Sequence, residues 1–169
     1  GECLLYPRFV KETAEMCREH HIHTAAESAF FVPWKNVEAV LPYIDLFFAD
    51  LKIPDPEKHR KYTGQDNSLI ISNIAKLSKR HSNIILRIPM IPGVNDSDGD
   101  MDGFAEIIRT FGGGIKGVEL LKYNHLAESK YSFAGRTYEK FADGSQTNEE
   151  MTKLCSSLAD KSKVNCYFV

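Results

Sequence analysis

The sequence has four cysteines among 169 residues but no Cys-x-x-Cys pair, so its cysteine spacing alone builds neither a zinc nor an iron–sulfur site. No apolar run approaches the roughly 20 residues of a membrane span, and no basic-then-apolar leader opens the chain. The formal net charge is −2 and no basic stripe is present. We therefore expect neither a nucleic acid nor a membrane as a partner, and reduced thiols in the cytoplasm.

The composition is that of a globular protein, with 43% hydrophobic and 26% charged residues. Disorder, collagen and coiled coil are excluded. The length suits one domain better than two, and we find no linker or internal repeat. The sequence therefore predicts a single domain over residues 1–169.

Helical and extended patterns alternate along the chain. Helices are expected from Pro7, from Pro33, from Asp55 to Arg80, from the caps at 96–98, and from a capping box of Thr147 and Glu150. Strands are expected at 22–27, 46–52, 83–91, 115–123 and 164–169. This alternation with short connections is typical of a parallel α/β architecture. A closed eight-stranded barrel needs about 200 residues or more, so either a partial β/α barrel or an open doubly wound sheet is expected.

Polar residues gather where these strands end, which is where parallel β/α folds bind ligands. The residues are Glu27, Ser28, Asp50, Lys52, Arg87, Asn124 and His125. Charges in apolar strands are costly to bury without a partner. Two carboxylates, Glu2 and Asp50, and two cations, Lys52 and Arg87, suit a zwitterion such as an amino acid. The alternative is that Asp50 forms structural ion pairs with Lys52 or Arg87.

Five segments carry a further signal in their order: Gly1-Glu2-Cys3-Leu4-Leu5, His23-Thr24-Ala25-Ala26-Glu27-Ser28, Asp50-Leu51-Lys52, Leu86-Arg87 followed by Ile91-Pro92-Gly93-Val94-Asn95-Asp96, and Leu120-Leu121-Lys122-Tyr123-Asn124. Together they resemble the radical S-adenosylmethionine (radical SAM) enzymes that activate glycyl radical enzymes, such as pyruvate formate-lyase activating enzyme. The first segment resembles the end of that family's Gly-Gly-Glu-Pro-Leu motif, with Cys3 in place of proline. The resemblance covers nearly the whole chain and implies a partial, truncated TIM-like barrel with parallel strands.

The resemblance also implies a cofactor site. Gly1 and Glu2 match the segment that holds the SAM ammonium, Asp50 and Lys52 lie around the ammonium and carboxylate, and Arg87 serves the carboxylate. Asn124 or its neighbour His125 would touch the adenosyl part. Glu27 and Ser28 stand where the family often has Asp-Thr, beside a site for a cation and the SAM carboxylate. We expect no catalytic acid, base or nucleophile and no metal ligand in this chain.

The activity implied belongs to the longer parent. A reduced [4Fe–4S] cluster passes one electron to SAM, and the resulting 5′-deoxyadenosyl radical removes hydrogen from a glycine of a partner enzyme. The Cys-x3-Cys-x2-Cys cluster motif is missing from this sequence. We therefore expect the chain to be the C-terminal part of such an enzyme, inactive alone. A flavodoxin or ferredoxin would donate the electron, in anaerobic metabolism.

Three other functions remain open on the sequence alone. One is a radical SAM enzyme that acts on a small molecule or RNA, and another is a binding module that keeps the barrel without redox chemistry. A cluster-free aldolase or phosphate-binding barrel is disfavoured, because no glycine-rich loop follows a strand. If strands are missing before residues 22–27, that segment is an unpaired edge, and we expect self-association through it.

Overall fold

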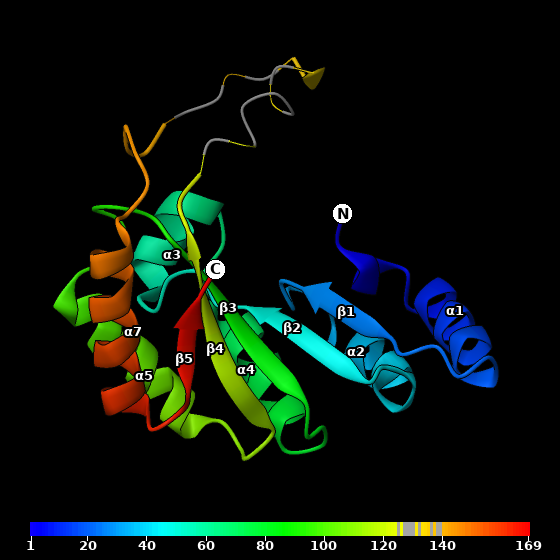
Figure 1. The fold of residues 1–169 in the computed structure, drawn as a ribbon. Coiled ribbons are helices and arrows are strands. Elements are labelled where there is room, and N and C mark those ends of the chain that lie inside the picture. The colour runs from blue at the N-terminus through cyan, green and yellow to red at the C-terminus, as the bar shows by residue number, and fades with distance from the viewer. Residues whose placement is uncertain (125, 127–130, 132, 136, 138–139) are drawn as a thin grey trace.

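Five parallel strands form one sheet in the order β1-β2-β3-β4-β5 (Figure 1). The computed structural model describes residues 1–169 except 125, 127–130, 132, 136, 138 and 139. The strands are β1 (Ala25–Ser28), β2 (Leu46–Asp50), β3 (Ile84–Met90), β4 (Ile115–Lys122) and β5 (Cys166–Phe168). The predicted number of strands is confirmed.

The helices begin where the sequence places prolines and capping residues. They are η1 (Cys3–Leu5), α1 (Pro7–Glu19), α2 (Trp34–Val40), η2 (Leu41–Tyr43), α3 (Pro56–Thr63), α4 (Ser68–Ser78), α5 (Asp98–Thr110) and α7 (Asn148–Ser162). The Asp55 side chain accepts a hydrogen bond from the Lys58 backbone N–H at the start of α3. Thr147 and Glu150 form the predicted capping box of α7.

The single helix expected from Asp55 to Arg80 is wrong, because the segment forms two helices. Gly64 ends α3 with φ 84°, a left-handed conformation that favours glycine. Asn67 then lies buried before α4, and its side-chain N–H group donates to the backbone oxygens of Ile53 and Pro54 at 2.9 and 2.8 Å. The chain therefore turns at residues 64–67 and fixes the start of α4 to the loop after β2.

The sequential strand order decides between the two predicted architectures. Right-handed crossovers between strands in sequential order place every crossover helix on the same face of the sheet. A doubly wound sheet needs a reversal of strand order, which this sheet does not show. Figure 1 shows α2, α4, α5 and α7 along one side of the strands. The fold is therefore a partial β/α barrel.

The hydrophobic core lies between this helical layer and one face of the sheet. Burial alternates along β2 and β3, as the period of two requires. The buried apolar residues of the strands are Ala26, Phe47, Ala49, Ile84, Leu86, Ile88, Met90, Val118 and Leu120. They pack with apolar residues of α2, α4, α5 and α7. The opposite face presents side chains of the other parity, which include Glu27, Asp50 and Arg87, whereas Ser28 is aligned with Ala49 on the core face.

The first strand is shorter than predicted and begins at Ala25 rather than at residue 22. Thr24, directly before it, donates its backbone N–H to the Asp45 carboxylate at 2.7 Å and its hydroxyl to the Tyr43 carbonyl at 3.0 Å. These bonds join the segment to the start of β2. Glu27 is consequently the third of four strand residues.

The strand β1 pairs only with β2 in the described sheet. The carbonyl oxygen of Glu27 faces away from β2, since the Cys3 thiol lies 3.5 Å from it. The backbone groups of Ala25 point to the same side, because strand backbones repeat every two residues. Unpaired N–H and C=O groups at a sheet edge are a template for pairing with another strand.

We predict that the chain self-associates through β1. Light scattering should give a mass that rises with concentration, and Ala25→Pro should reduce that rise, because proline removes the outward N–H without touching a β1–β2 bond. Ala25→Ser keeps the N–H and is the matched control. A concentration-independent monomer would contradict the prediction.

Candidate functional site

A row of polar side chains crosses the sheet on the face opposite the helices. The strand register aligns Asp50 with Arg87, Arg87 with Glu119, and Glu119 with Tyr167 as neighbouring Cα partners. Residues aligned in this way on adjacent strands point to the same face. Four strands therefore contribute to one row, which we call the polar row.

The expectation that Arg87 ends its strand is wrong. Arg87 is the fourth of seven residues of β3, which continues to Met90. Asp50 and Arg87 are Cα partners in the register of β2 and β3. The strand β2 ends at Asp50, whereas β3 continues to Met90. The two side chains therefore share a level of the sheet although only Asp50 is terminal.

The Arg87 guanidinium lies between two carboxylates. Its Nε donates to Glu119 Oε2 at 2.5 Å, and its Nη1 donates to Glu27 Oε2 at 2.8 Å. The guanidinium carbon is 3.8 Å from the centre of the Phe48 ring, a cation–π contact. Burial opposes the charge, but the hydrogen bonds with Glu119 and Glu27 outweigh it and raise the pKa of Arg87. The cation is thus fixed on three sides.

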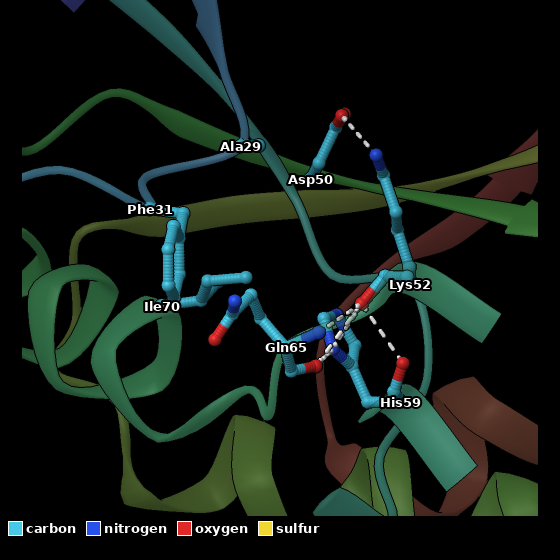
Figure 2. A pocket seen from close by; sticks show the side chains of 8 residues that line it. Ala29, Phe31, Asp50, Lys52, His59, Gln65 and Ile70 are labelled. Atoms are coloured by element: carbon cyan, nitrogen blue, oxygen red, sulfur yellow. Dashed lines mark hydrogen bonds and ion pairs between the residues drawn. The ribbon is translucent and has the colours of Figure 1, made fainter. Parts of the chain in front are cut away.

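Asp50 and Lys52 face each other at the end of β2 (Figure 2). Lys52 Nζ is 3.8 Å from Asp50 Oδ2, at the outer limit of an ion pair. Burial raises the pKa of Asp50 and the charge of Glu27 adds to the rise, while Lys52 opposes it. Burial therefore disfavours the charge of Asp50, and the two nearby cations, Lys52 and Arg87, do not fully offset it.

A hollow of about 170 Å³ lies beside this pair (Figure 2). Asp50 and Lys52 line it together with Ala29, Phe31, His59, Thr63, Gln65 and Ile70. Arg87 is not among the lining residues, although it is adjacent to Asp50 in the register. The hollow therefore lies between the Asp50 end of the polar row, the loop after β1 and the helix α3.

The structural ion pairs left open by the sequence are partly present. Asp50 pairs with Lys52 at 3.8 Å. The ion-pair partners of Arg87 are Glu27 and Glu119 instead of Asp50. The Asp50–Lys52 pair thus meets the structural interpretation, whereas Arg87 takes its ion pairs from Glu27 and Glu119.

Glu2 and Ser28 bind each other. Glu2 Oε1 accepts from the Ser28 hydroxyl at 2.8 Å and from the Leu4 N–H at 3.0 Å, and Oε2 accepts from the Ala29 N–H at 2.9 Å. The Ser28 hydroxyl also accepts from the Phe30 N–H at 2.8 Å. These side chains join the start of the chain to the end of β1. The charge of Glu2 still contributes to the raised pKa of Asp50.

The remaining predicted site residues are not brought to the polar row by any contact in the described part of the chain. Gly1 is exposed. Asn124 is exposed and bonds locally, accepting from the Leu126 N–H at 3.1 Å and donating to the Lys122 carbonyl at 3.5 Å. His125 lies outside the described residues.

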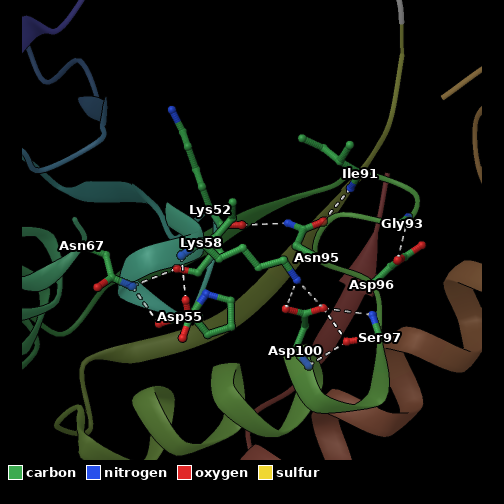
Figure 3. A network of polar contacts seen from close by, with 12 residues as sticks. Lys52, Asp55, Lys58, Asn67, Ile91, Gly93, Asn95, Asp96, Ser97 and Asp100 are labelled. Atoms are coloured by element: carbon green, nitrogen blue, oxygen red, sulfur yellow. Dashed lines mark hydrogen bonds and ion pairs between the residues drawn. The ribbon is translucent and has the colours of Figure 1, made fainter. Parts of the chain in front are cut away.

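Buried asparagine amides fix the rim of the sheet behind Lys52 (Figure 3). Asn95 is fully buried, and its Nδ2 donates to the carbonyls of Lys52 and Pro89 at 2.7 and 2.8 Å. Its Oδ1 accepts from the Ile91 N–H at 2.7 Å. One side chain therefore joins the loops that follow β2 and β3 and sets the backbone position of Lys52.

A second ion pair supports the same rim. Lys58 Nζ of α3 lies 2.8 and 3.1 Å from the two carboxylate oxygens of Asp100 in α5. Burial opposes ionisation of Asp100, but the hydrogen bonds from Lys58 and Ser97 outweigh it and lower its pKa. This pair is structural, since it joins two helices.

Sequence reasoning missed Glu119 and His59. Glu119 is 7% exposed and stands between apolar neighbours in β4, the same signal that singles out Arg87 on β3. His59 is 3% exposed, and its Nδ1 lies 2.6 Å from the Gln65 carbonyl, while Nε2 has no hydrogen-bond partner among the described residues. A histidine within a polar helix gave no signal in the sequence, because its burial depends on the turn at Gly64.

Charge balance indicates what the polar row can bind. Glu27, Asp50 and Glu119 form ion pairs with Lys52 and Arg87, and the charge of Glu2 also acts on Asp50, so four carboxylates stand against two cations. The excess of two negative charges favours a ligand with net positive charge. Among the described residues, no group of three His, Cys, Asp or Glu side chains is placed to hold a metal ion.

Comparisons with known proteins agree on one family. The profile of the Radical SAM superfamily matches residues 1–105. The (2S)-3-sulfopropanediol dehydratase activating enzyme of Klebsiella oxytoca is 44% identical over 82% of this chain and 44% of its own length. The 4-hydroxyphenylacetate decarboxylase activating enzyme of Clostridium scatologenes is 36% identical over 99% of this chain and 53% of its own length. The chain thus spans about half the length of the curated relatives it matches.

A solved structure supports the fold. A domain of pyruvate-formate lyase-activating enzyme from Bacteroides vulgatus superposes with a TM-score of 0.81 at 23% identity, over 100% of this chain and 94% of that one. No helix of the described residues is long and apolar enough to cross a membrane.

We predict that Asp50→Asn stabilises the chain at neutral pH, on the order of 1 kcal/mol. The raised pKa means that the folded state holds the Asp50 proton more tightly than the unfolded state does. The protonated Asp50 carboxyl therefore contributes to the stability of the folded state at low pH. This contribution is lost as the pH rises above 3.8 through the raised pKa of Asp50. Chemical denaturation from pH 3 to about 8 measures it. Asp102→Asn, whose side chain is 63% exposed, is the control.

We predict that Asn95→Asp lowers the free energy of unfolding by about 2–3 kcal/mol. The substitution places a carboxylate oxygen against the carbonyls of Lys52 and Pro89, to which the amide donated. Urea denaturation measures the loss. The exposed Asn165→Asp should change stability little, and equal effects of the two variants would contradict the role given to Asn95.

Proposed function

Because the chain belongs to the radical SAM superfamily, we propose that its polar row binds the methionyl end of SAM in an enzyme that activates a glycyl radical enzyme. The observation that carries this proposal is that Asp50 and Arg87 lie at one level of the uncovered sheet face, with Lys52 Nζ 3.8 Å from Asp50. The printed names of the relatives, all activating enzymes, support the reaction class.

The chemistry of the donor set fits SAM. SAM carries a sulfonium, an ammonium and a carboxylate, and therefore a net charge of +1, which the excess negative charge of the polar row favours. Asp50, a partly buried carboxylate whose charge is disfavoured by burial, suits a further cationic partner such as the ammonium. Lys52 and Arg87 suit the carboxylate, since charge-assisted hydrogen bonds are the stronger ones.

The other predicted contacts remain part of the proposal with altered roles. The carboxylate of Glu2 and the hydroxyl of Ser28 hold the backbone at the start of the chain, so Gly1 and Glu2 would meet the ammonium through backbone groups. Asn124 or His125 would meet the adenosyl part.

The [4Fe–4S] cluster does not fit the residues of this chain. The four cysteines are far apart in sequence, and the described residues hold no cysteine-containing metal-binding group. The family implies such a cluster, which together with SAM supplies the one-electron chemistry for glycyl radical formation. Within the proposal this chain binds and orients SAM and has no cluster ligand.

We further propose a glycyl radical enzyme as protein partner, with pyruvate formate-lyase as one candidate, and a flavodoxin or ferredoxin as electron donor in anaerobic metabolism. The free cysteines support a reducing, cytoplasmic location. A core that runs from Leu4 to Leu158 supports residues 1–169 as one domain. A radical SAM enzyme for a small molecule or RNA is disfavoured by the relatives' names.

We predict that the full-length protein, reconstituted with iron and sulfide and reduced, cleaves SAM to methionine and 5′-deoxyadenosine and forms a glycyl radical on its partner, seen by electron paramagnetic resonance. Lys52→Gln should raise the KM for SAM about tenfold, the effect of losing one charged contact.

Lys61→Gln is the matched control, because Lys61 is an exposed lysine of the neighbouring helix α3. SAM cleavage without a glycyl radical on any partner would favour a different radical SAM reaction. A protein that binds no SAM would refute the proposed function.

A further inference from the structure

The structure raises a question about how Arg87 receives a ligand carboxylate. Two of its five N–H groups already donate to carboxylates, Nε to Glu119 and Nη1 to Glu27. The Phe48 ring covers the guanidinium carbon at 3.8 Å. A bidentate carboxylate needs two neighbouring N–H groups of the guanidinium. The guanidinium has two such pairs, Nε with Nη2 and Nη1 with Nη2, and each already has one nitrogen bound to a carboxylate. A ligand carboxylate that binds either pair therefore competes with Glu119 or with Glu27.

The two carboxylates differ in how firmly they are held. The Glu119 side chain is 10% exposed and lies directly beside Arg87 in the register of β3 and β4. The Glu27 side chain is 55% exposed and reaches Arg87 from β1, two strands away. An exposed ion pair contributes little to stability, whereas breaking a buried one leaves an uncompensated charge. Glu27 is thus the partner that leaves more easily.

We propose that Glu27 is a displaceable substitute for the ligand carboxylate on Arg87, while Glu119 keeps the guanidinium in position. This inference rests on the proposed SAM site and assigns to Glu27 a role opposite to direct ligand binding. The carboxylate of SAM would replace that of Glu27 on Nη1, an exchange of one anion for another that leaves the charge on Arg87 compensated throughout.

The exchange determines which ligands Glu27 discriminates against. A ligand with a carboxylate has to compete with Glu27, whereas a ligand without one does not. Glu27 also adds negative charge near Asp50, and this charge attracts any cationic ligand. The two effects oppose each other for SAM, and only the attraction acts on decarboxylated SAM, which keeps the sulfonium, the amine and the adenosine.

The test is calorimetric titration of the full-length protein, reconstituted but not reduced, with SAM and with decarboxylated SAM. Glu27→Gln should lower the Kd for SAM about three- to fivefold, the effect of removing one exposed competing ion pair. It should leave the Kd for decarboxylated SAM unchanged or higher. Glu12→Gln is the matched control, since Glu12 is 56% exposed and pairs with Arg8 at 2.7 Å on α1, away from the polar row.

Glu119→Gln tests the other half of the proposal and should raise the Kd for SAM more than that for decarboxylated SAM. If this variant does not fold, the Glu27→Gln comparison decides alone. Weaker binding of both ligands by Glu27→Gln would show that Glu27 contacts the ligand, which overturns the inference and leaves the proposed function intact. Binding of neither ligand by the unmodified full-length protein would refute the proposed function and this inference with it.

Discussion

The arginine held between two glutamates on the open face of the sheet is the interaction on which the site depends. A guanidinium in an apolar parallel strand is costly unless its N–H groups are paired. Glu119 supplies that pairing from the adjacent strand and Glu27 completes it from across the sheet. Asp50 adds a carboxylate at the level of Arg87, and Lys52 adds a second cation beside Asp50.

The architecture makes this arrangement possible by separating two tasks. One face of the sheet packs against α2, α4, α5 and α7 and provides the core, so the other face is free to carry charge. The loops at the carboxyl ends of the strands are held by buried amides, with Asn95 between β2 and β3 and Asn67 before α4. This rim keeps Lys52 near Asp50, at an ion-pair distance of 3.8 Å.

Local features of the sequence predicted the fold well, because caps and turns depend on near neighbours. Pro7 begins α1, and Thr147 with Glu150 caps α7, as their residue types require. The expectation of one helix from Asp55 to Arg80 misses Gly64, whose left-handed backbone ends α3 before α4 begins. The sequence also indicated a parallel architecture, but strand order was needed to choose the partial barrel over the doubly wound sheet.

The site was predictable in its residue types and less so in its contacts. The charges of Asp50, Lys52 and Arg87 stand out in apolar surroundings. The partners of Arg87 depend on the register between strands distant in sequence, and no local pattern encodes that register. The bond between the Glu2 and Ser28 side chains likewise joins residues distant in sequence, and no local pattern predicts it.

The central claim is that the polar row binds the charged head of SAM. Nuclear magnetic resonance of the ¹⁵N-labelled chain during addition of SAM tests it most directly. The claim predicts that the signals of residues 50–52, of the Arg87 side chain and of Glu119 shift together with one affinity, while those of α5 and α7 stay in place. Shifts confined to the helical layer, or none at saturating SAM, would contradict it.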